Sequence, residues 1–426
     1  MEICTVGAGY VGLTTSALLS DLGHNVHVID KDISKIEILN KGKSPIHEPG
    51  LEELLIKNHQ RGRLVFSDDR EACILNSPIL LIAVGTPSKP NGDSDLSAIK
   101  KVFEHIAMNI TSHKLIIVKS TVPPGSNEWF HQYLIDQGVD EKMFEIVSNP
   151  EFLREGTAVY DSFHPDKVVV GSKSKQAINK VKQLYESLQA PCIETTLTGA
   201  ELVKYASNAF LATKISFINE FARICDGYNV NILDVTKAIG LDPRIGPHFL
   251  QSGLGYGGSC FPKDLDAISF AARKKRIKTN LLDAVRKVNH QQVDVYVNKL
   301  AEPLNGFKGK QITVWGLSFK PNTDDIRDSR AITLCERLIE KGCTIIAYDP
   351  KATSHNNHIK EENNIYNAVY QSDALIVATE WDEFNQADWN RVKHLMKGNI
   401  ILDGRNTLDQ EAISASGLRY LGVARP

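Results

Sequence analysis

The sequence lacks any close pair of cysteines. Its seven cysteines are an odd number, they are scattered from Cys4 to Cys343, and no two stand in CxxC spacing. This pattern disfavours both a disulfide framework and a structural zinc site. Long hydrophobic runs are also missing. The longest, such as Ile79–Val84, have the length of a strand and are far too short to span a bilayer.

An excess of charge of either sign is absent as well. The 49 Lys and Arg residues nearly balance the 51 Asp and Glu residues, which leaves a net charge of −2. The balance argues against nucleic acid and an anionic membrane as partners, so any phosphate must be bound by locally placed cations and backbone N–H groups. No charged and apolar leader precedes the first predicted strand. We therefore expect a soluble, cytoplasmic protein.

A glycine-rich turn follows the first predicted strand. Residues 2–6 have the pattern of a buried strand, Gly7–Gly12 (GAGYVG) follow at once, and a helix is predicted over residues 11–22. The next predicted strand, Asn25–Ile29, leads directly to Asp30. A G-x-G-x-x-G motif between a strand and a helix, with an acid about 20 residues further on, is the full context of a dinucleotide site.

Each glycine of the motif has its own task. Gly7 permits the tight turn, Gly9 lets a pyrophosphate approach the backbone, and Gly12 lets the helix and the strand pack closely. The helix N-terminus offers N–H groups and the positive end of a dipole to the phosphates. Asp30 is expected to accept hydrogen bonds from ribose hydroxyls and to repel a 2′-phosphate, which favours NAD over NADP. A glycine-rich turn without a ligand is the alternative.

Unbroken apolar strands continue this part of the chain, as in a parallel sheet covered on both faces. They are expected at residues 63–67, 79–84, 115–119, 144–147 and 167–170. Two of them end in the loops Gly85–Pro87 and Ser120–Gly125. Ligands of such sheets bind outside the carboxyl ends of the strands, so Thr86, Pro87 and Thr121 are expected to face the cofactor. That these prolines merely turn the chain is an open alternative.

The segment Asn149–Gly156 (NPEFLREG) contains two carboxylates four residues apart. On one helical turn Glu151 and Glu155 would share a face and repel each other, which raises the pKa of one of them and suits a general base. The spacing alone favours the other interpretation, in which both are solvated surface charges.

A long helical pattern runs from Gly199 to about Tyr228. Apolar residues occupy much of its surface and predict a helix that is buried on most sides, within a domain or across a dimer. They are Leu202, Val203, Ala206, Phe210, Leu211, Ile215, Phe217, Ile218, Phe221 and Ile224. Lys204 and Asn208 lie one turn apart on one face. A lysine in a buried helix requires a partner or a ligand, and a structural ion pair is the alternative to a functional site.

The stretch Gly255–Asp264 (GYGGSCFPKD) joins glycines to a soft nucleophile, a cation and a carboxylate. The glycines between Gly246 and Gly258 describe a loop that wraps closely around something. Lys263 and Asp264 are expected to begin a helix, and a helix N-terminus near a lysine would favour the thiolate form of Cys260. A small buried hydrophobe is the more common role of a lone cysteine. Further helix is predicted at residues 231–240 and 263–298.

A second α/β pattern begins after residues 303–309. A strand at 311–317 and a later strand that ends before Asp349 repeat the N-terminal spacing. The glycine motif is replaced by the longer, cationic loop Phe319–Ser329 (FKPNTDDIRDS), which fits a nucleotide diphosphate bound in another way. We predict an α/β chain with two Rossmann-like doubly wound domains joined by a central all-helical region. The boundaries are 1–197, 198–302 and 303–426, a division that suits 426 residues.

Taken in order, these motifs resemble those of the nucleotide-sugar dehydrogenases, the UDP-glucose/GDP-mannose dehydrogenase family. The shared motifs are GAGYVG, STVPPG, NPEFLREG, K-x-x-x-N, GYGGSCFPKD and FKPNTDDIRDS, and they cover essentially the whole chain. Within the family the UDP-glucose 6-dehydrogenases are the most similar, because Arg244 precedes FLQSGLGYGGSCFPKD and the later loop reads KPNTDDIR.

The resemblance implies an NAD-dependent four-electron oxidation at C6 of UDP-glucose. Cys260 would capture the aldehyde as a thiohemiacetal, whose oxidation gives a thioester that water hydrolyses to the acid. Lys204 and Asn208 would stabilise the developing oxyanions. Glu151, or a water held by Thr121 and Asp264, would act as general base. A homodimer through the long central helix, or a larger assembly, is also implied.

The resemblance further implies which residues hold the two ligands. It implies no metal site. The cofactor would be held by Gly7, Gly9, Tyr10, Val11, Gly12, Asp30, Lys35, Thr86, Pro87, Thr121, Glu155, Lys263 and Arg327. The UDP-sugar would be held by Glu151, Phe152, Leu153, Glu155, Lys204, Asn208, Arg244, Phe249, Leu250, Ser252, Gly253, Tyr256, Gly257, Phe319, Lys320 and Arg405.

Three other hypotheses about the function compete with UDP-glucose oxidation. The same chemistry on GDP-mannose, UDP-galactose or a UDP-N-acetylhexosamine differs only in a few sugar contacts. A two-electron dehydrogenase of a hydroxy acid or a sugar phosphate needs neither a nucleophilic cysteine nor a second α/β domain. In an NAD-binding sensor or scaffold, Cys260 and Lys204 would be core residues.

Overall fold

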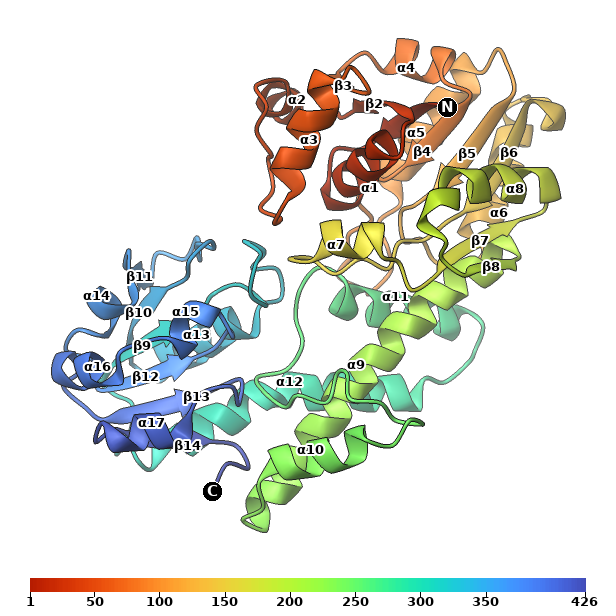
Figure 1. The fold of residues 1–426 in the computed structure, drawn as a ribbon. Helices are drawn as coiled ribbons and strands as arrows, with labels where there is room; N and C mark the ends of the chain where they lie inside the picture. The colour runs from red at the N-terminus through yellow and green to blue at the C-terminus, as the bar shows by residue number, and fades with distance from the viewer. The chain divides into compact units, whose positions relative to one another are not determined.

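The computed structural model describes residues 1–426, which form two compact units. Unit 1 comprises Met1–Ser207 and Asp266–Ile277, and unit 2 comprises Asn208–Leu265 and Lys278–Pro426. Two helices, α9 (Leu197–Gly227) and α11 (Phe261–Lys274), contribute residues to both units. Each unit contains one sheet with helices around it (Figure 1). None of the helices combines the length and the apolar character that crossing a bilayer requires.

The sheet of unit 1 has eight strands in the order β3-β2-β1-β4-β5-β6-β7-β8. Neighbouring strands are parallel except β6 and β7. The strands are β1 (Glu2–Val6), β2 (Asn25–Ile29), β3 (Leu64–Ser67), β4 (Ile79–Ile82), β5 (Lys114–Val118), β6 (Phe144–Ser148), β7 (Val168–Ser172) and β8 (Cys192–Thr195). The predicted strands are confirmed to within two residues. The edge strand β8 was not predicted because its short sequence has no apolar run.

The helices of unit 1 follow the strands as in a doubly wound fold. They are α1 (Tyr10–Asp21), α2 (Ile33–Asn40), α3 (Leu51–Gln60), α4 (Arg70–Asn76), α5 (Ser97–Asn109), α6 (Ser126–Asp136), α7 (Ala158–Phe163) and α8 (Lys175–Leu184), with 3₁₀ turns η1 (Glu141–Met143) and η2 (Glu186–Leu188). Successive residues of β1 point to opposite faces. Accordingly Ile3 belongs to one hydrophobic cluster and Cys4 to another, so both faces of the sheet are covered.

One disulfide, Cys4–Cys73, joins β1 to α4 with the two Cα atoms 5.7 Å apart. The scattered cysteine spacing did not indicate it. The bridge depends on a strand and a helix that meet only in the fold, 69 residues apart in sequence. The other five cysteines, including Cys260, are thiols.

The sheet of unit 2 has six parallel strands in the order β11-β10-β9-β12-β13-β14. They are β9 (Gln311–Trp315), β10 (Thr344–Tyr348), β11 (Ile359–Glu361), β12 (Ala374–Val377), β13 (Ile400–Asp403) and β14 (Arg419–Gly422). In chain order this is 3-2-1-4-5-6, the order of the first six strands of unit 1. The prediction of two Rossmann-like sheets is confirmed. The strands β11 and β14, which are short and partly polar, were not predicted.

The remaining helices surround this sheet or precede it. They are α10 (Ile232–Gly240), α12 (Asn280–Ala301), α13 (Arg330–Glu340), α14 (Ile365–Val369), α15 (Asp382–Asn385), α16 (Trp389–Leu395) and α17 (Gln410–Ala415). The central region is helical as predicted, but the expected helix 263–298 is two helices, α11 and α12. Arg276 adopts a left-handed φ of 60° between them and interrupts the helical hydrogen bonding.

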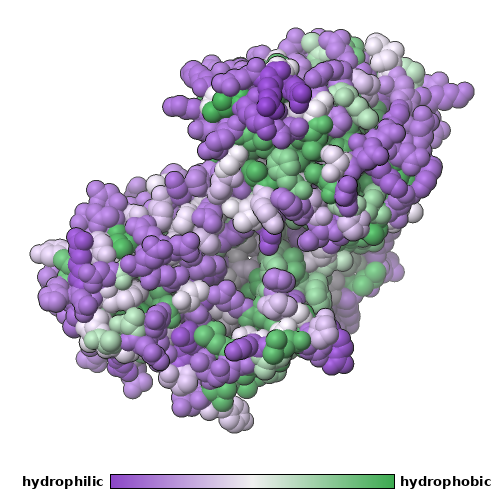
Figure 2. Space-filling model, in the orientation of Figure 1, coloured by the Kyte–Doolittle hydropathy of each residue, from purple (hydrophilic) through white to green (hydrophobic).

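The long helix α9 confirms the predicted bounds to within two residues, but the prediction of burial on most sides is wrong for the single chain. Of the ten apolar residues only Ile218 is buried, and Phe210 is 65% exposed. The buried face carries small and polar residues such as Ala212 and Asn219 instead. Hydrophobic residues gather on the surface over α9 and α10 in the space-filling view (Figure 2).

Candidate active site

The GAGYVG turn requires two of its glycines for the fold and leaves space at the third. A Cβ on Gly7, whose φ is +111°, would lie 2.7 Å from the carbonyl oxygen of Ala83, and one on Gly12 would lie 1.8 Å from that of Gly7. A Cβ on Gly9 would meet no atom within 4 Å. The N-terminus of α1 is therefore open at Gly9, where a pyrophosphate needs to approach the backbone.

The carboxylate of Asp30 is fixed at the end of β2. Its Oδ2 accepts the Ala8 N–H at 2.6 Å and its Oδ1 accepts the Asp32 N–H at 2.9 Å. Each carboxylate oxygen has two lone pairs, so both can accept another donor such as a ribose hydroxyl. Together with the space at Gly9, this geometry fits a dinucleotide.

The loops after β4 and β5 are joined by side chains. The Thr86 hydroxyl donates to the Thr121 carbonyl at 2.7 Å, and the Ser120 hydroxyl donates to the Val84 carbonyl at 2.7 Å. Because β1, β4 and β5 are parallel neighbours, their loops emerge at the same edge of the sheet. Pro87 is exposed there, whereas Thr86 is buried.

The NPEFLREG segment is not helical around Glu151, so Glu151 and Glu155 do not share a helical turn. The favoured interpretation of Glu151 as a solvated surface charge is also wrong, because its side chain is buried. Glu151 instead accepts a hydrogen bond from the Lys204 ammonium at 2.9 Å, and its other oxygen accepts the Leu153 N–H at 2.6 Å. Both side chains of the ion pair are almost fully buried. Burial alone would raise the pKa of Glu151, but Lys204, the Leu153 N–H and Lys119 together lower it. Glu151 is thus held as a carboxylate.

Two ammonium groups face the ring of Phe152. The Nζ of Lys204 lies 5.3 Å and that of Lys167 lies 4.6 Å from the ring centroid. Unit 1 therefore brings together four of the predicted substrate residues, Glu151, Phe152, Leu153 and Lys204.

A second group of predicted residues meets in unit 2, around the buried Asp264. The Asn208 amide donates to Oδ2 of Asp264 at 2.6 Å, and the Lys263 ammonium contacts Oδ1 at 2.6 Å. Cys260 directly precedes α11, and its carbonyl accepts the Asp264 N–H at 2.9 Å. The Cys260 Sγ lies 3.5 Å from the Ser259 hydroxyl. The prediction that Cys260 sits at a helix N-terminus is confirmed.

The glycines before Cys260 make room for another part of the chain. A Cβ on Gly258 would lie 2.6 Å from the Phe319 ring, and one on Gly257 would lie 2.2 Å from the carbonyl oxygen of Asp328. The Gly258 N–H donates to the Arg327 carbonyl at 2.9 Å. The FKPNTDDIRDS loop thus packs against the GYGGSC segment. We expected this loop to wrap closely around a ligand. At Gly257 and Gly258 it instead packs against another loop of unit 2.

Most of the predicted cations are held by acidic neighbours. Arg244 pairs with Asp242 and Arg327 with Asp325, each two residues away, while Arg405 pairs with Glu380. Lys320 lies with its Nζ 5.6 Å from the centroid of the Phe319 ring. Arg244 and Arg327 are exposed, so their guanidinium groups retain access to solvent.

Several predicted substrate residues are core residues of unit 2. Leu250, Ser252 and Tyr256 are at most 5% exposed. Tyr256 exchanges two backbone hydrogen bonds with the Asn289 side chain, at 2.8 and 3.0 Å. Phe249 has a left-handed φ of 62° and contacts Phe261. Asn289 was missed because a single amide in a long helix gives no signal in sequence.

Other buried charges near the predicted residues were also missed. Glu48 accepts the Gly156 and Ala158 N–H groups, each at 2.6 Å, and a hydrogen bond from the Tyr10 hydroxyl, so it joins the fingerprint helix to the NPEFLREG segment. Glu201 accepts the Gly125 N–H at 2.5 Å, and burial raises its pKa to about 7. The sequence offered two signals for these residues. Glu48 stands before a Pro-Gly pair, and Glu201 is a carboxylate within the long helix α9.

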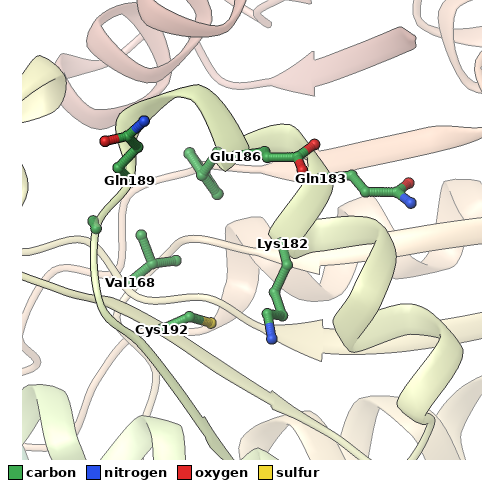
Figure 3. A pocket seen from close by; sticks show the side chains of 8 residues that line it. Val168, Lys182, Gln183, Glu186, Gln189 and Cys192 are labelled. Carbon is green, nitrogen blue, oxygen red and sulfur yellow. The ribbon is translucent and has the colours of Figure 1, made fainter.

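A pocket of about 210 Å³ lies elsewhere on unit 1, beside α8 and η2 (Figure 3). Lys182, Gln189 and Cys192 are among its lining residues, and none of the residues predicted for cofactor or substrate lines it. It is therefore separate from the strand-end loops.

Three family models match the chain in order. Residues 1–189 match the NAD binding domain of the UDP-glucose/GDP-mannose dehydrogenase family, residues 198–291 its central domain and residues 313–410 its UDP binding domain. The chain belongs to this family. The predictions of an NAD-dependent oxidoreductase and of its nucleotide-sugar class are confirmed at this level.

Relatives of the chain align with it from end to end. The putative UDP-glucose 6-dehydrogenase YtcA of Bacillus subtilis is 49% identical, with 100% of each chain covered, and TuaD of the same organism is 39% identical, with 100% and 93% covered. The solved UDP-glucose dehydrogenase of Pyrobaculum islandicum is 35% identical with a TM-score of 0.93, with 99% and 97% covered. A UDP-D-ManNAc dehydrogenase of Pyrococcus horikoshii is 27% identical with a TM-score of 0.90, with 100% and 99% covered.

Proposed function

We propose that the protein oxidises the C6 alcohol of UDP-glucose to the carboxylate of UDP-glucuronate, a four-electron reaction. The observation that carries this proposal is the thiol of Cys260 at the N-terminus of α11, in a chain whose full-length relatives include UDP-glucose 6-dehydrogenases. A nucleophilic thiol is needed when an aldehyde must be held and oxidised again, and it leaves easily from the acyl intermediate.

The residues divide the proposed work. When bound, NAD accepts one hydride in each of the two oxidations. Lys204 and Asn208 stabilise the negative charge that develops on the C6 oxygen. Cys260 adds to the aldehyde and later leaves when water hydrolyses the thioester. Glu151, or a water held by Thr121 and Asp264, accepts the protons released.

For the two ligands we propose the binding residues that were predicted from the sequence. Gly7–Gly12 and Asp30, with Lys35, Thr86 and Pro87, hold NAD. The exposed guanidinium groups of Arg244 and Arg327 exchange their acidic neighbours for ligand groups, since a surface ion pair costs little to open. Residues 1–197 form the NAD domain, 198–302 the central domain and 303–426 the UDP-sugar domain. A cytoplasmic location is proposed from the five free thiols, whereas the Cys4–Cys73 disulfide is unusual for that compartment.

The test is a panel of UDP- and GDP-sugars assayed with NAD and with NADP, in which the reduced cofactor formed per sugar is counted. We expect two NADH per UDP-glucose and little turnover with NADP, because Asp30 repels a 2′-phosphate. One NADH per molecule would indicate a two-electron dehydrogenase. A preference for a UDP-N-acetylhexosamine, such as the UDP-D-ManNAc after which the Pyrococcus dehydrogenase is named, would move the proposal to that substrate. No turnover with any sugar would leave an NAD-binding protein without this activity.

We further propose that a second copy of the chain covers the exposed apolar residues of α9 and makes the protein a dimer. Phe210, Phe217 and Ile224 recur every seven residues along one side of the helix and are each at least 48% exposed. Such a stripe is usually buried against a partner.

Light scattering after size exclusion is expected to give twice the chain mass of 47.2 kDa. The double variant Phe210→Glu with Phe217→Glu is expected to give the monomer mass, because buried carboxylates at the interface would be unpaired. Met108→Glu, at an exposed apolar residue of α5, is the matched control and keeps the dimer mass. A dimer that survives both glutamates on α9 contradicts this interface.

A further inference from the structure

Glu48 is a buried carboxylate to which the proposed reaction gives no task. It stands in the loop between α2 and α3, and its side chain is 5% exposed. Glutamate is almost never buried unless its charge is paired or hydrogen-bonded. The groups that its two oxygens accept from therefore indicate what this charge is for.

The first carboxylate oxygen of Glu48 has a structural task. Oε1 accepts the Ala158 N–H at 2.6 Å and the Val159 N–H at 3.4 Å, at the start of α7. Thr157, the N-cap residue of this helix, makes no capping hydrogen bond with its own side chain. Oε1 therefore takes the place of an N-cap and satisfies backbone donors that the helix leaves open.

The second carboxylate oxygen of Glu48 joins two parts of the candidate active site. Oε2 accepts the Gly156 N–H at 2.6 Å and a hydrogen bond from the Tyr10 hydroxyl, whose oxygen also accepts the Gly156 N–H at 3.0 Å. Tyr10 is the first residue of α1 and directly follows Gly9, the open position of the GAGYVG turn. Capping a helix requires one acceptor, so this second contact is additional to the cap.

The NPEFLREG segment needs such contacts because residues 151–156 form neither helix nor strand. Its conformation therefore depends on side chains from other parts of unit 1. Glu151, near its start, is held by the Lys204 ammonium at 2.9 Å. Gly156, at its end, has a left-handed φ of 83° and is held by Glu48. Glu48 thus fixes the end of the segment against the helix of the dinucleotide fingerprint.

We propose that Glu48 is a positioning residue for the oxidation, which holds Tyr10 on the fingerprint helix and the segment that carries Glu151 in one geometry. This role rests on the proposed function, in which NAD binds at the N-terminus of α1 and Glu151 accepts a proton. A misplacement of about 1 Å between reacting groups can lower a rate about 100-fold. Glu48 acts on the reaction through Tyr10 and Gly156, and it touches neither ligand.

The test compares Glu48→Gln, Tyr10→Phe and the double variant with wild type, using UDP-glucose and NAD. An amide has one acceptor oxygen where the carboxylate has two, so it cannot serve both α7 and the Tyr10 side. Glu48→Gln is expected to lower kcat about 10- to 30-fold and Tyr10→Phe about 10-fold. Both changes break the same contact, so the double variant should lose no more than about threefold beyond Glu48→Gln. Independent effects would multiply to at least about 100-fold.

Binding of NADH gives a second measurement that needs no sugar. Tyr10 begins the helix whose N–H groups are proposed to hold the pyrophosphate, so its displacement weakens that site. Fluorescence titration is expected to give a Kd for NADH that is raised about 3- to 10-fold in each single variant, with no further rise in the double variant. KM for UDP-glucose should stay within about threefold, because most residues proposed for the UDP-sugar belong to unit 2.

Two control variants separate positioning from stability. Glu52→Gln changes an exposed carboxylate that accepts the Ser44 N–H at 2.8 Å, and it is expected to keep both kcat and the Kd for NADH. Lys114→Met removes a buried ammonium that donates to the carbonyls of Leu75 at 2.7 Å and Ser77 at 2.9 Å. Its loss leaves two buried carbonyls without this donor, so Tm should fall while kcat is kept.

Two outcomes overturn the inference while the proposed function stands. One is a Glu48→Gln variant with wild-type kcat and NADH affinity, and the other is a double variant whose loss equals the product of the single losses, so that Glu48 only caps α7. If Glu48→Gln does not fold, Tyr10→Phe with wild-type kcat and Kd has the same meaning. Wild-type protein that forms no NADH with any nucleotide sugar overturns the proposed function, and the NADH titration then still decides whether Glu48 acts through Tyr10.

Discussion

Cys260→Ser is expected to stop steady-state turnover and to leave the sugar attached to the protein. The serine hydroxyl can add to the aldehyde, and oxidation of that adduct gives an oxygen ester in place of the thioester. An ester hydrolyses far more slowly because an alkoxide is a poorer leaving group than a thiolate. We expect kcat to fall at least about 10³-fold, as when a nucleophile is lost, after a burst of two NADH per subunit.

Mass spectrometry of the denatured variant should show the mass of the UDP-glucuronyl group on the peptide that contains residue 260. Cys192→Ser is the matched control, because Cys192 is also a partly exposed thiol but lies on the edge strand β8 and not at the N-terminus of a helix. That variant is expected to turn over normally and to carry no adduct. Normal turnover by Cys260→Ser would mean that the second oxidation does not pass through this side chain.

Lys204→Met is expected to have the second largest effect, on both rate and stability. Loss of the ammonium removes a donor to the oxyanion, and kcat should fall about 10²- to 10³-fold. It also leaves Glu151 buried with Lys119 as its remaining cation, so the pKa of Glu151 should rise. Breaking one side of a buried ion pair costs roughly 3–5 kcal/mol of unfolding free energy, of which Lys119 offsets a part.

The loss of unfolding free energy in Lys204→Met is expected to depend on pH. The pKa of Glu151 is lowered in the folded wild type, so its stabilisation is present above the unfolded pKa and is lost as pH falls through the folded pKa. In the variant, where burial is no longer offset by Lys204, we expect the folded pKa to lie above the unfolded one, so that stability is lost as pH rises. The difference in unfolding free energy between the two proteins, measured in urea, should be larger at pH 7 than at pH 4.5.

Lys214→Met provides the control on the same helix. Lys214 donates from its ammonium to the Ile245 carbonyl at 3.1 Å and is partly exposed, so its loss should cost about 1 kcal/mol or less. Its kcat is expected to stay at the wild-type value. If Lys204→Met kept both its rate and its stability, the ion pair with Glu151 would have no role in either.

The fold class and the family could both be predicted from the amino-acid sequence. The period of the apolar residues, the glycine spacing and the position of Asp30 reflect local backbone geometry. For this reason β1, α1 and β2 were predicted nearly to the residue. The repeat of the strand pattern in unit 2 was visible for the same reason. The motif order then identified the family, because six short segments in fixed order rarely coincide.

The pairing of charged side chains could not be predicted in this way, because it depends on how distant segments pack. The sequence favoured Glu151 as a solvated surface charge, with repulsion by Glu155 as the alternative, but its partner is Lys204 on α9, 53 residues later. The disulfide Cys4–Cys73 and the buried Lys119 were likewise hidden. The glycines before Cys260 make room for a loop some 60 residues further on in the chain. A sequence pattern encodes local conformation, whereas desolvation and long-range pairing depend on packing that no local pattern records.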